Sequence, residues 1–429
     1  MEHQKYTKFF VSLVILLLAG SALLLPGILR KENTLIGDKP YYHLRLAQTD
    51  KDELSFSGRD NELSFGWNFI LKYVSMNIAL FVLGLIAIVL LYLNLKSLRL
   101  NHRFLSVAIF TLSPAFIYMF SIGERFGIAF VLSLVISYLV IKEKYKFLVL
   151  PFIVLLLFDI SITIFALTCL GLYLLYFKKD KSIFYGIVTI IFLLLLIIGK
   201  WKFNLISDFG SNIGVSVFAL VFVLFCFTVF WRKLLPMFGI LFILILISLK
   251  FEFGIFYLSV FLSVLLSLCL ANVYDAKWES ELIRDFMILL VFCGLLFSGL
   301  SYTNRLSQEM PHQEIFDALE SLPEGAVVFS DITYGHWITY SGKKNVWDTF
   351  TRISNFDEIE KELNSAIDSR DSFLTKQILD KYNVDYIFVD PALTEKWNGK
   401  GIIYLLEYDS GQFRRIYDRD GTIIWRHYK

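Results

Sequence analysis

Long apolar runs without a charged residue constrain this chain more than any other feature of its sequence. Five such runs are Val11–Leu25, Ile78–Leu93, Ile183–Gly199, Val215–Trp231 and Ile255–Ala271. Because an α-helix rises about 1.5 Å per residue, a helix needs about twenty apolar residues to cross a bilayer. Charged residues make up only 19% of the 429 residues, below the roughly 25% of soluble domains. The sequence therefore predicts a polytopic α-helical membrane protein.

The number of spans depends on one run that is too long for a single helix. The run at residues 147–177 exceeds the usual length of about 17–25 residues and contains Asp159 near its middle. We therefore expect a helical hairpin that turns at Asp159, and about eleven spans in all. The other apolar runs lie near residues 9–29, 71–95, 104–121, 125–141, 183–199, 214–231, 235–249, 252–272 and 286–301.

The distribution of basic residues predicts the orientation of these spans. With eleven spans, the polar links on the side of the N-terminus contain 15 Lys and Arg in 40 residues, against 9 in 61 on the opposite side. Basic residues accumulate in cytoplasmic loops. The N-terminus is therefore predicted to be cytoplasmic and the C-terminus extracytoplasmic, in a cell membrane. A net charge of +2 gives no field that would attract a nucleic acid.

Two polar segments fall on the outer side in this topology. We predict a transmembrane domain over residues 1–301, with an outer loop at 30–70, and an extracytoplasmic domain over residues 302–429. The second domain mixes the patterns of helices and short strands, which is typical of an α/β fold. Its predicted helices are Pro311–Ser321 and Phe373–Tyr382, and its predicted strands are Ala326–Ser330, Asp385–Asp390 and a hairpin over Phe413–Tyr428.

The outer loop contains the first candidate site, in residues 37–45 (GDKPYYHLR). The carboxylate of Asp38 could coordinate a divalent cation or accept a proton from an attacking hydroxyl. The guanidinium of Arg45 could bind a phosphate with two hydrogen bonds. The alternative is an interfacial helix that Asp38 caps, with Tyr41 and Tyr42 in an aromatic belt at the lipid headgroups.

Two further acids lie at predicted outer turns. Glu124, in the short link Gly123-Glu124-Arg125, would be a second carboxylate close to the membrane surface and could share a metal or an acid–base role with Asp38. The alternative is an ordinary charge pair at a helix end. Asp159 is either a functional acid within an apolar run or a solvated turn residue.

Several soluble-enzyme and transport functions find no support in the sequence. Phosphate-binding and nucleotide-binding glycine motifs, zinc-protease motifs and serine-hydrolase motifs are all absent. The spans contain few charged residues that could relay protons or ions, which argues against a pump. A secondary transporter or lipid flippase would need broken helices in two related halves, and the sequence has one candidate hairpin.

The layout and four segments together resemble the GT-C class of integral membrane glycosyltransferases. Residues 37–45 look like the acidic motif in the first loop of the archaeal oligosaccharyltransferase catalytic subunit, and residues 112–116 (LSPAF) leading to 123–125 (GER) are similar to its second acidic region. Residues 329–340 (FSDITYGHWITY) resemble its Trp-Trp-Asp-Tyr-Gly region, and residues 381–390 (KYNVDYIFVD) resemble a strand entry of the archaeal members.

This resemblance implies a GT-C-like fold and a sugar donor linked to a membrane lipid. The chain would transfer a sugar or oligosaccharide from a polyprenyl- or dolichyl-phosphate carrier to an acceptor on the outer membrane face. Asp38 and Glu124 would be the catalytic residues. They would also be the ligands of Mg²⁺ or Mn²⁺ if a metal is used, because some members need none. The donor phosphate would be bound by His43, Arg45 and Arg125.

The acceptor side departs from the family pattern. Tyr334 and Gly335 are retained as acceptor-side residues, whereas Asp331, Ile332 and Thr333 stand where the family has Trp-Trp-Asp. In the family this motif binds the acceptor peptide, so the acceptor of this chain is left open. The departure also favours an alternative function, that of a non-catalytic lipid-sugar binding or scaffold protein with the same fold.

Overall fold

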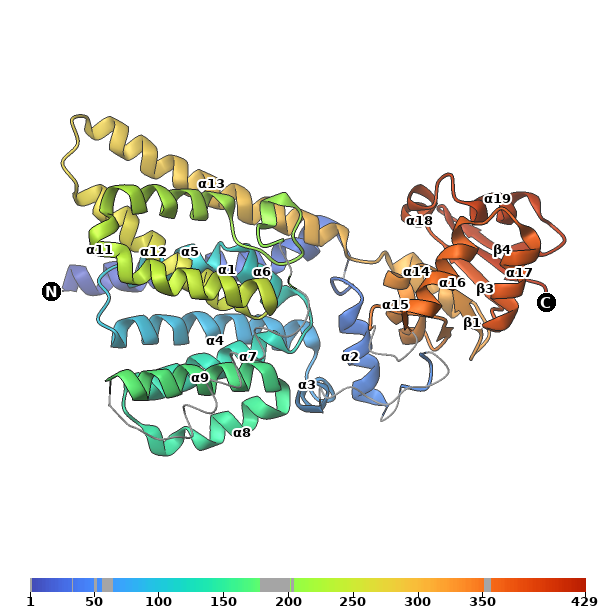
Figure 1. Ribbon diagram of the computed structural model, residues 1–429, viewed down its shortest axis with the longest axis horizontal. Coiled ribbons are helices and arrows are strands. Elements are labelled where there is room, and N and C mark those ends of the chain that lie inside the picture. The colour runs from blue at the N-terminus through green and yellow to red at the C-terminus, as the bar shows by residue number, and fades with distance from the viewer. Residues whose placement is uncertain are drawn as a thin grey trace. The chain divides into compact units, whose positions relative to one another are not determined.

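The computed structural model describes residues 2–32, 34–49, 52–55, 65–177, 201, 204–350 and 356–429. The chain forms two compact units (Figure 1). The first unit contains Met1–Lys31 and Leu63–Glu309, and the second contains Glu32–Glu62 and Met310–Lys429. The division at 301/302 predicted from the sequence leaves the outer loop with the first domain, whereas the structure groups most of this loop with the C-terminal residues.

The first unit is helical. Four of its described helices are long and apolar enough to cross a membrane, or five if the bent pair α5 and α6, which meet at 61°, counts as one span. The chain is therefore a multi-pass membrane protein, while eleven spans remain a prediction. The predicted run 183–199 lies outside the described residues. The helices are α1 (Glu2–Arg30), α3 (Phe65–Leu71), α4 (Met76–Ser97), α5 (Arg103–Thr111), α6 (Pro114–Ser121), α7 (Phe126–Ile141), α8 (Val149–Phe158), α9 (Ile160–Phe177), α11 (Val217–Lys250), α12 (Gly254–Asp275) and α13 (Glu281–Gln308), with short 3₁₀ turns η1 (Tyr145–Phe147) and η2 (Ser207–Phe209).

The predicted hairpin at Asp159 is confirmed. Helix α8 ends at Phe158 and α9 begins at Ile160, and Asp159 between them has an extended backbone with φ −156° and ψ 116°. The Asp159 carboxylate accepts a hydrogen bond of 2.9 Å from the backbone N–H of Ile162, which caps the start of α9. Helices α8 and α9 lie side by side (Figure 1).

Helix α11 also turns back on itself. The backbone of Phe230 is non-helical, with φ −117° and ψ 24°. The rings of Phe227 and Phe238 lie 4.3 Å apart, whereas residues eleven positions apart in a straight helix would be separated by about 16 Å. The two arms of α11 (Figure 1) correspond to the two apolar runs expected near residues 214–231 and 235–249.

The second unit is built on a five-stranded sheet with the strand order β2-β1-β3-β5-β4. Strand β1 pairs in parallel with β2 and β3, and β5 pairs antiparallel with β3 and β4. The predicted α/β fold and its Asp-Gly hairpin are confirmed, since Asp420 and Gly421 both have positive φ at the β4–β5 turn. The strands are β1 (Val327–Phe329), β2 (Lys344–Asn345), β3 (Tyr386–Val389), β4 (Phe413–Arg419) and β5 (Thr422–His427).

Helices cover this sheet and enclose its apolar core. The outer loop joins the unit through α2, which packs against α15, and through a bridge between Ser55 and Asn345 beside β2. Tyr41 of α2 belongs to the same buried core as Phe316 and Trp337. The helices are α2 (Lys39–Gln48), α14 (Gln313–Glu320), α15 (Gly335–Tyr340), α16 (Phe356–Asp368), α17 (Ser372–Lys381), α18 (Pro391–Lys396) and α19 (Gly401–Tyr408), with a 3₁₀ turn η3 (Ile332–Tyr334).

Candidate functional site

Asp38 is placed by the turn that leads into α2. Gly37 has φ +79°, a conformation that glycine adopts without strain, and its carbonyl accepts a hydrogen bond of 3.0 Å from the indole N–H of Trp337. Asp38 occupies the N-cap position of α2, but its side chain makes no capping hydrogen bond. The hydroxyl of Thr349 donates to the Asp38 carboxylate instead. The Asp38 carboxylate therefore belongs to the second unit, and the hydrogen bond from Trp337 to Gly37 fixes the turn that precedes it.

The tyrosines that follow Asp38 lie inside the second unit. Tyr41 and Tyr42 are 4% and 1% exposed, so the interpretation as an aromatic belt at the headgroups is wrong. The Tyr41 oxygen accepts a hydrogen bond of 2.9 Å from the backbone N–H of Leu35, and burial raises the pKa of the Tyr41 phenol. The ring of Tyr42 contacts the rings of His43 and His336. Helix α2 therefore positions Asp38 by packing into this core.

Arg45 has a protein partner within the outer loop. Its guanidinium forms an ion pair with Asp52, which is fully buried, and lies 3.4 Å from the hydroxyl of Ser55. This pair ties the end of α2 to the segment that joins β2. Phosphate binding by Arg45 remains a prediction. A phosphate would have to compete with the Asp52 carboxylate for the Arg45 guanidinium.

In the first unit, the link between α6 and α7 holds Glu124. Glu124 is 8% exposed, and its carboxylate accepts a hydrogen bond of 3.3 Å from the phenol of Tyr118. The guanidinium Nε of Arg125 lies 3.2 Å from the carboxylate of Asp159. The structure therefore brings the second and third candidate acids to the same end of the helical bundle. Asp159 is also 8% exposed, so the interpretation of Asp159 as a solvated turn residue is wrong.

The two predicted catalytic carboxylates belong to different units, so their pairing remains a prediction. Among the described residues, no group of three or more His, Cys, Asp and Glu side chains is arranged to hold a metal ion. Mg²⁺ and Mn²⁺ prefer several oxygen ligands. Neither unit alone offers such a set in its described part, so the use of a divalent cation also remains a prediction.

Tyr334 and Gly335 have clear structural roles. The phenol of Tyr334 donates a hydrogen bond of 2.7 Å to Asp390, and burial together with this carboxylate raises the pKa of Tyr334. A Cβ on Gly335 would lie 2.3 Å from the backbone oxygen of Trp347, so only glycine fits there. An acceptor-side role for these two residues remains a prediction.

Sequence reasoning missed Lys250, the last residue of α11. Its Nζ is buried and makes no hydrogen bond in the described part of the chain, while the ring of Trp201 lies 5.8 Å away. Lys250 precedes the link to the next helix, α12, and Phe256 in the first turn of α12 stacks on Tyr118, the hydrogen-bond partner of Glu124. A lysine at the end of an apolar run is common, so nothing in the sequence was a reason to select Lys250. Its lack of a hydrogen-bond acceptor among the described residues is visible only in the folded structure.

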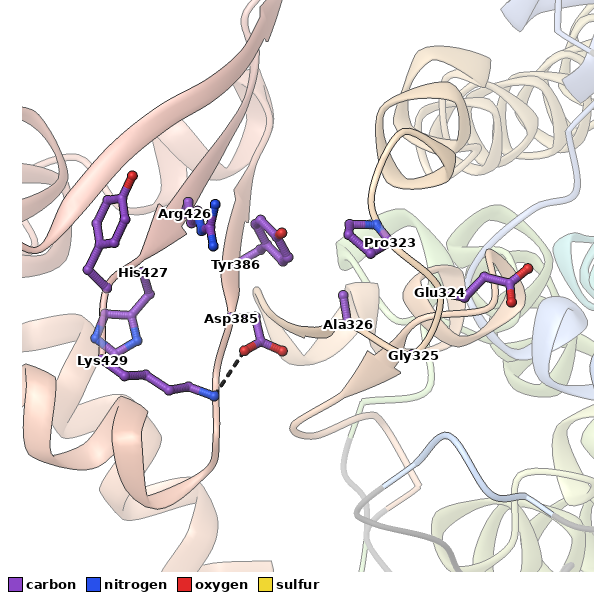
Figure 2. Close-up of a pocket in the computed structure, with 10 residues that line it drawn as sticks. Pro323, Glu324, Gly325, Ala326, Asp385, Tyr386, Arg426, His427 and Lys429 are labelled. Atoms are coloured by element: carbon purple, nitrogen blue, oxygen red, sulfur yellow. Dashed lines mark hydrogen bonds and ion pairs between the residues drawn. The ribbon is translucent and has the colours of Figure 1, made fainter.

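Two pockets lie among the described residues of the second unit. The larger one measures about 420 Å³, and no predicted site residue lines it. It lies where β1 and β3 begin, beside the end of β5, and Figure 2 shows the ammonium of Lys429 directed at the carboxylate of Asp385, 2.9 Å away. The smaller pocket measures about 210 Å³ and is lined in part by Asp331, Ile332 and Trp397. It therefore adjoins the segment that departs from the family's acceptor motif.

The fold is similar to that of an archaeal oligosaccharyltransferase. The enzyme of Archaeoglobus fulgidus tethered to an acceptor peptide with the NVT sequon aligns with a TM-score of 0.59 and 12% identity, over 99% of this chain and 74% of that chain. AglB from the same organism, in complex with an inhibitory peptide and a dolichol-phosphate, aligns with a TM-score of 0.54 and 12% identity over 99% and 75%. The complex with Zn and sulfate gives 0.56 and 14% over 97% and 73%.

These matches confirm the predicted resemblance at the level of the fold. No protein-family model matches the sequence, and neither does any curated protein. The chain thus has an oligosaccharyltransferase-like GT-C fold, with a sequence only 12–14% identical to these solved structures.

Proposed function

We propose that this chain is a membrane glycosyltransferase that takes a sugar or oligosaccharide from a polyprenyl- or dolichyl-phosphate carrier. The observation that carries the proposal is the oligosaccharyltransferase-like fold along 99% of the chain. The similar structures include one with a dolichol-phosphate and one with an acceptor peptide. A fold by itself does not define a reaction. The buried carboxylate of Glu124 and the partly buried Asp38 add the acidic groups that such a transfer needs.

The reaction would be a displacement at the anomeric carbon. The acceptor's hydroxyl or amide attacks this carbon, the bond to the carrier phosphate breaks, and the phosphate leaves with the electron pair. Asp38 would take the acceptor's proton or coordinate a cation, and Glu124 would be its partner. A bound Mg²⁺ or Mn²⁺ would supply electrostatic stabilisation of the departing phosphate.

Lys250 is the residue that we assign to the donor phosphate in the first unit. Arg125 is paired with Asp159, and in the second unit Arg45 is paired with Asp52, so both already have an anionic partner. A buried ammonium without an acceptor is costly, and a phosphate oxygen would supply one. His43 and Arg45 remain candidates on the second unit.

The proposal is tested by a transfer assay with purified protein. A labelled polyprenyl-phosphate sugar is incubated with the protein and with peptide, lipid and glycan acceptors, and the wild-type chain should form product. The variant Lys250→Gln should raise the KM for the donor about tenfold, since it loses a charge-assisted hydrogen bond. Lys96→Gln, at the last turn of α4, is a control that should leave the KM unchanged.

Two outcomes would contradict this proposal. Product formation that is equal in the wild type and in a heat-inactivated sample would remove the transferase assignment. Binding of the donor without turnover, across all acceptors, would support the non-catalytic lipid-sugar binder. That alternative is favoured by Asp331, whose carboxylate pairs with Lys396 and which stands where the family motif has its first Trp.

We also propose that the second unit lies on the extracytoplasmic side. The proposal rests on the excess of basic residues in the links that share a side with the N-terminus. Protease added to intact cells should remove the C-terminal residues from 310 onward and spare a tag placed before Lys5. If the C-terminus is protected until the cells are lysed, the second unit lies on the cytoplasmic side. Transfer from a lipid-linked donor on the outer face would then be excluded.

A further inference from the structure

The link that carries Glu124 is fixed on both sides of this residue. On one side, the indole N–H of Trp67 in α3 donates a hydrogen bond of 3.0 Å to the carbonyl of Gly123. On the other side, Arg125 is paired with Asp159 at a distance of 3.2 Å. Trp67 is fully buried and Asp159 is 8% exposed, so in each contact the side chain that holds the link is shielded from water.

The two fixing residues come from elements that touch each other. A Cβ on Gly66, the neighbour of Trp67, would lie 3.1 Å from the ring of Phe158 and 3.2 Å from the carbonyl of Leu157. Phe158 directly precedes Asp159. The glycine therefore lets α3 approach the α8–α9 turn closely. Trp67 and Asp159, which hold the Glu124 link, thus belong to elements that pack against each other.

Asp159 also makes a contact that fixes its own orientation. One carboxylate oxygen caps α9 at the N–H of Ile162, and the other oxygen faces Arg125. An acid in an otherwise apolar run of this length is costly unless its charge is used. The cap alone would be satisfied by a neutral Asn or Ser, so the cap does not explain the charge.

We propose that Trp67 and Asp159 are positioning residues that fix the carboxylate of Glu124 for the transfer reaction. The inference rests on the proposed function for its catalytic part only. By holding residues 123 and 125, the pair removes the backbone freedom of the residue between them. A small misplacement of a reacting group costs up to about 100-fold in rate. The restricted backbone of Glu124 therefore contributes to kcat rather than to donor binding.

The kinetic test uses substitutions that remove one polar or charged group and leave an aromatic ring or an amide in its place. Trp67→Phe loses the indole N–H, and Asp159→Asn loses the charge while it can still cap α9. Each should lower kcat about tenfold to 100-fold and leave the donor KM within about twofold. Asp159→Glu should recover most of the rate. Since both contacts act on one link, the double variant should lose less than the product of the single losses.

A matched control is available in the same unit. The indole N–H of Trp278 also donates to a backbone carbonyl, that of Val273, at 2.7 Å, but beyond the last turn of α12. Trp278→Phe removes the same kind of hydrogen bond and should leave kcat unchanged. If Trp278→Phe lowers kcat as much as Trp67→Phe does, the loss reflects general stability and the positioning role is overturned.

A second readout is independent of any transferase activity. In a full-length chain whose four native cysteines are replaced by serine, Glu124→Cys introduces one thiol into the link. Its modification by a soluble thiol reagent should be about tenfold faster after Trp67→Phe or Asp159→Asn, because each removes a contact that closes the link. Unchanged rates would overturn the inference. Faster rates, combined with no transfer by the wild-type chain in the donor assay, would leave the positioning intact and remove the proposed function.

Discussion

Replacing Asp38 by Asn should abolish sugar transfer, with a loss of about 1,000-fold in initial rate, while membrane insertion is retained. Asn has nearly the same volume and can still accept the hydrogen bond from Thr349. It cannot take up a proton or neutralise a cation, and general-base catalysis contributes about 100- to 10,000-fold. The measurement is the initial rate with a labelled polyprenyl-phosphate sugar, together with the amount of folded protein in detergent.

Asp317→Asn is the control for this change. Asp317 is an exposed acid of α14 in the same unit, and within the described part of the chain its carboxylate is bound locally, by Gln313, so its loss should change neither rate nor folding. Transfer that persists in Asp38→Asn would remove Asp38 from the catalytic role. Transfer lost equally in both variants would indicate a general loss of charge at the surface of the unit.

The helical fold was predictable because apolar spans leave a strong local signal. The run at 147–177 contains a single acid, and the chain breaks its helix at that residue, Asp159. The β4–β5 hairpin was predictable for a similar reason, because Asp420-Gly421 between two alternating segments favours a tight turn with positive φ. Both predictions depend on residues that are close in the sequence.

The environment of the candidate site was not predictable in the same way. Arg45 is ion-paired with Asp52, and Tyr41 packs on Phe316, which is far away in the sequence. The buried ammonium of Lys250 makes no hydrogen bond to the described residues, and this depends on where the fold places the possible acceptors. These contacts are set by tertiary packing, and no pattern of period 2 or 3.6 in the sequence encodes them.

Gly335 matches the glycine of the family motif either because it acts on the acceptor or because only glycine packs against Trp347. Measurements of stability separate these two explanations. A Cβ on Gly335 would lie 2.3 Å from the carbonyl oxygen of Trp347 and 2.5 Å from the Cβ of Asp348. The first of these atoms belongs to the backbone and cannot rotate away. Gly335→Ala should therefore lower the free energy of unfolding of the second unit by about 3 kcal/mol, as overpacking of a tight core does.

The measurement is chemical unfolding of the full chain in detergent, followed through the tryptophans of the second unit. Gly411→Ala is the matched control, because its added Cβ would lie 3.5 Å from the nearest atom and its backbone φ is ordinary, so the free energy should change little. If Gly335→Ala is as stable as the control but loses transfer, the glycine acts on the acceptor and the packing explanation fails. If stability falls as expected, retention of Gly335 reflects its packing against Trp347, and the resemblance at this position gives no information about the acceptor.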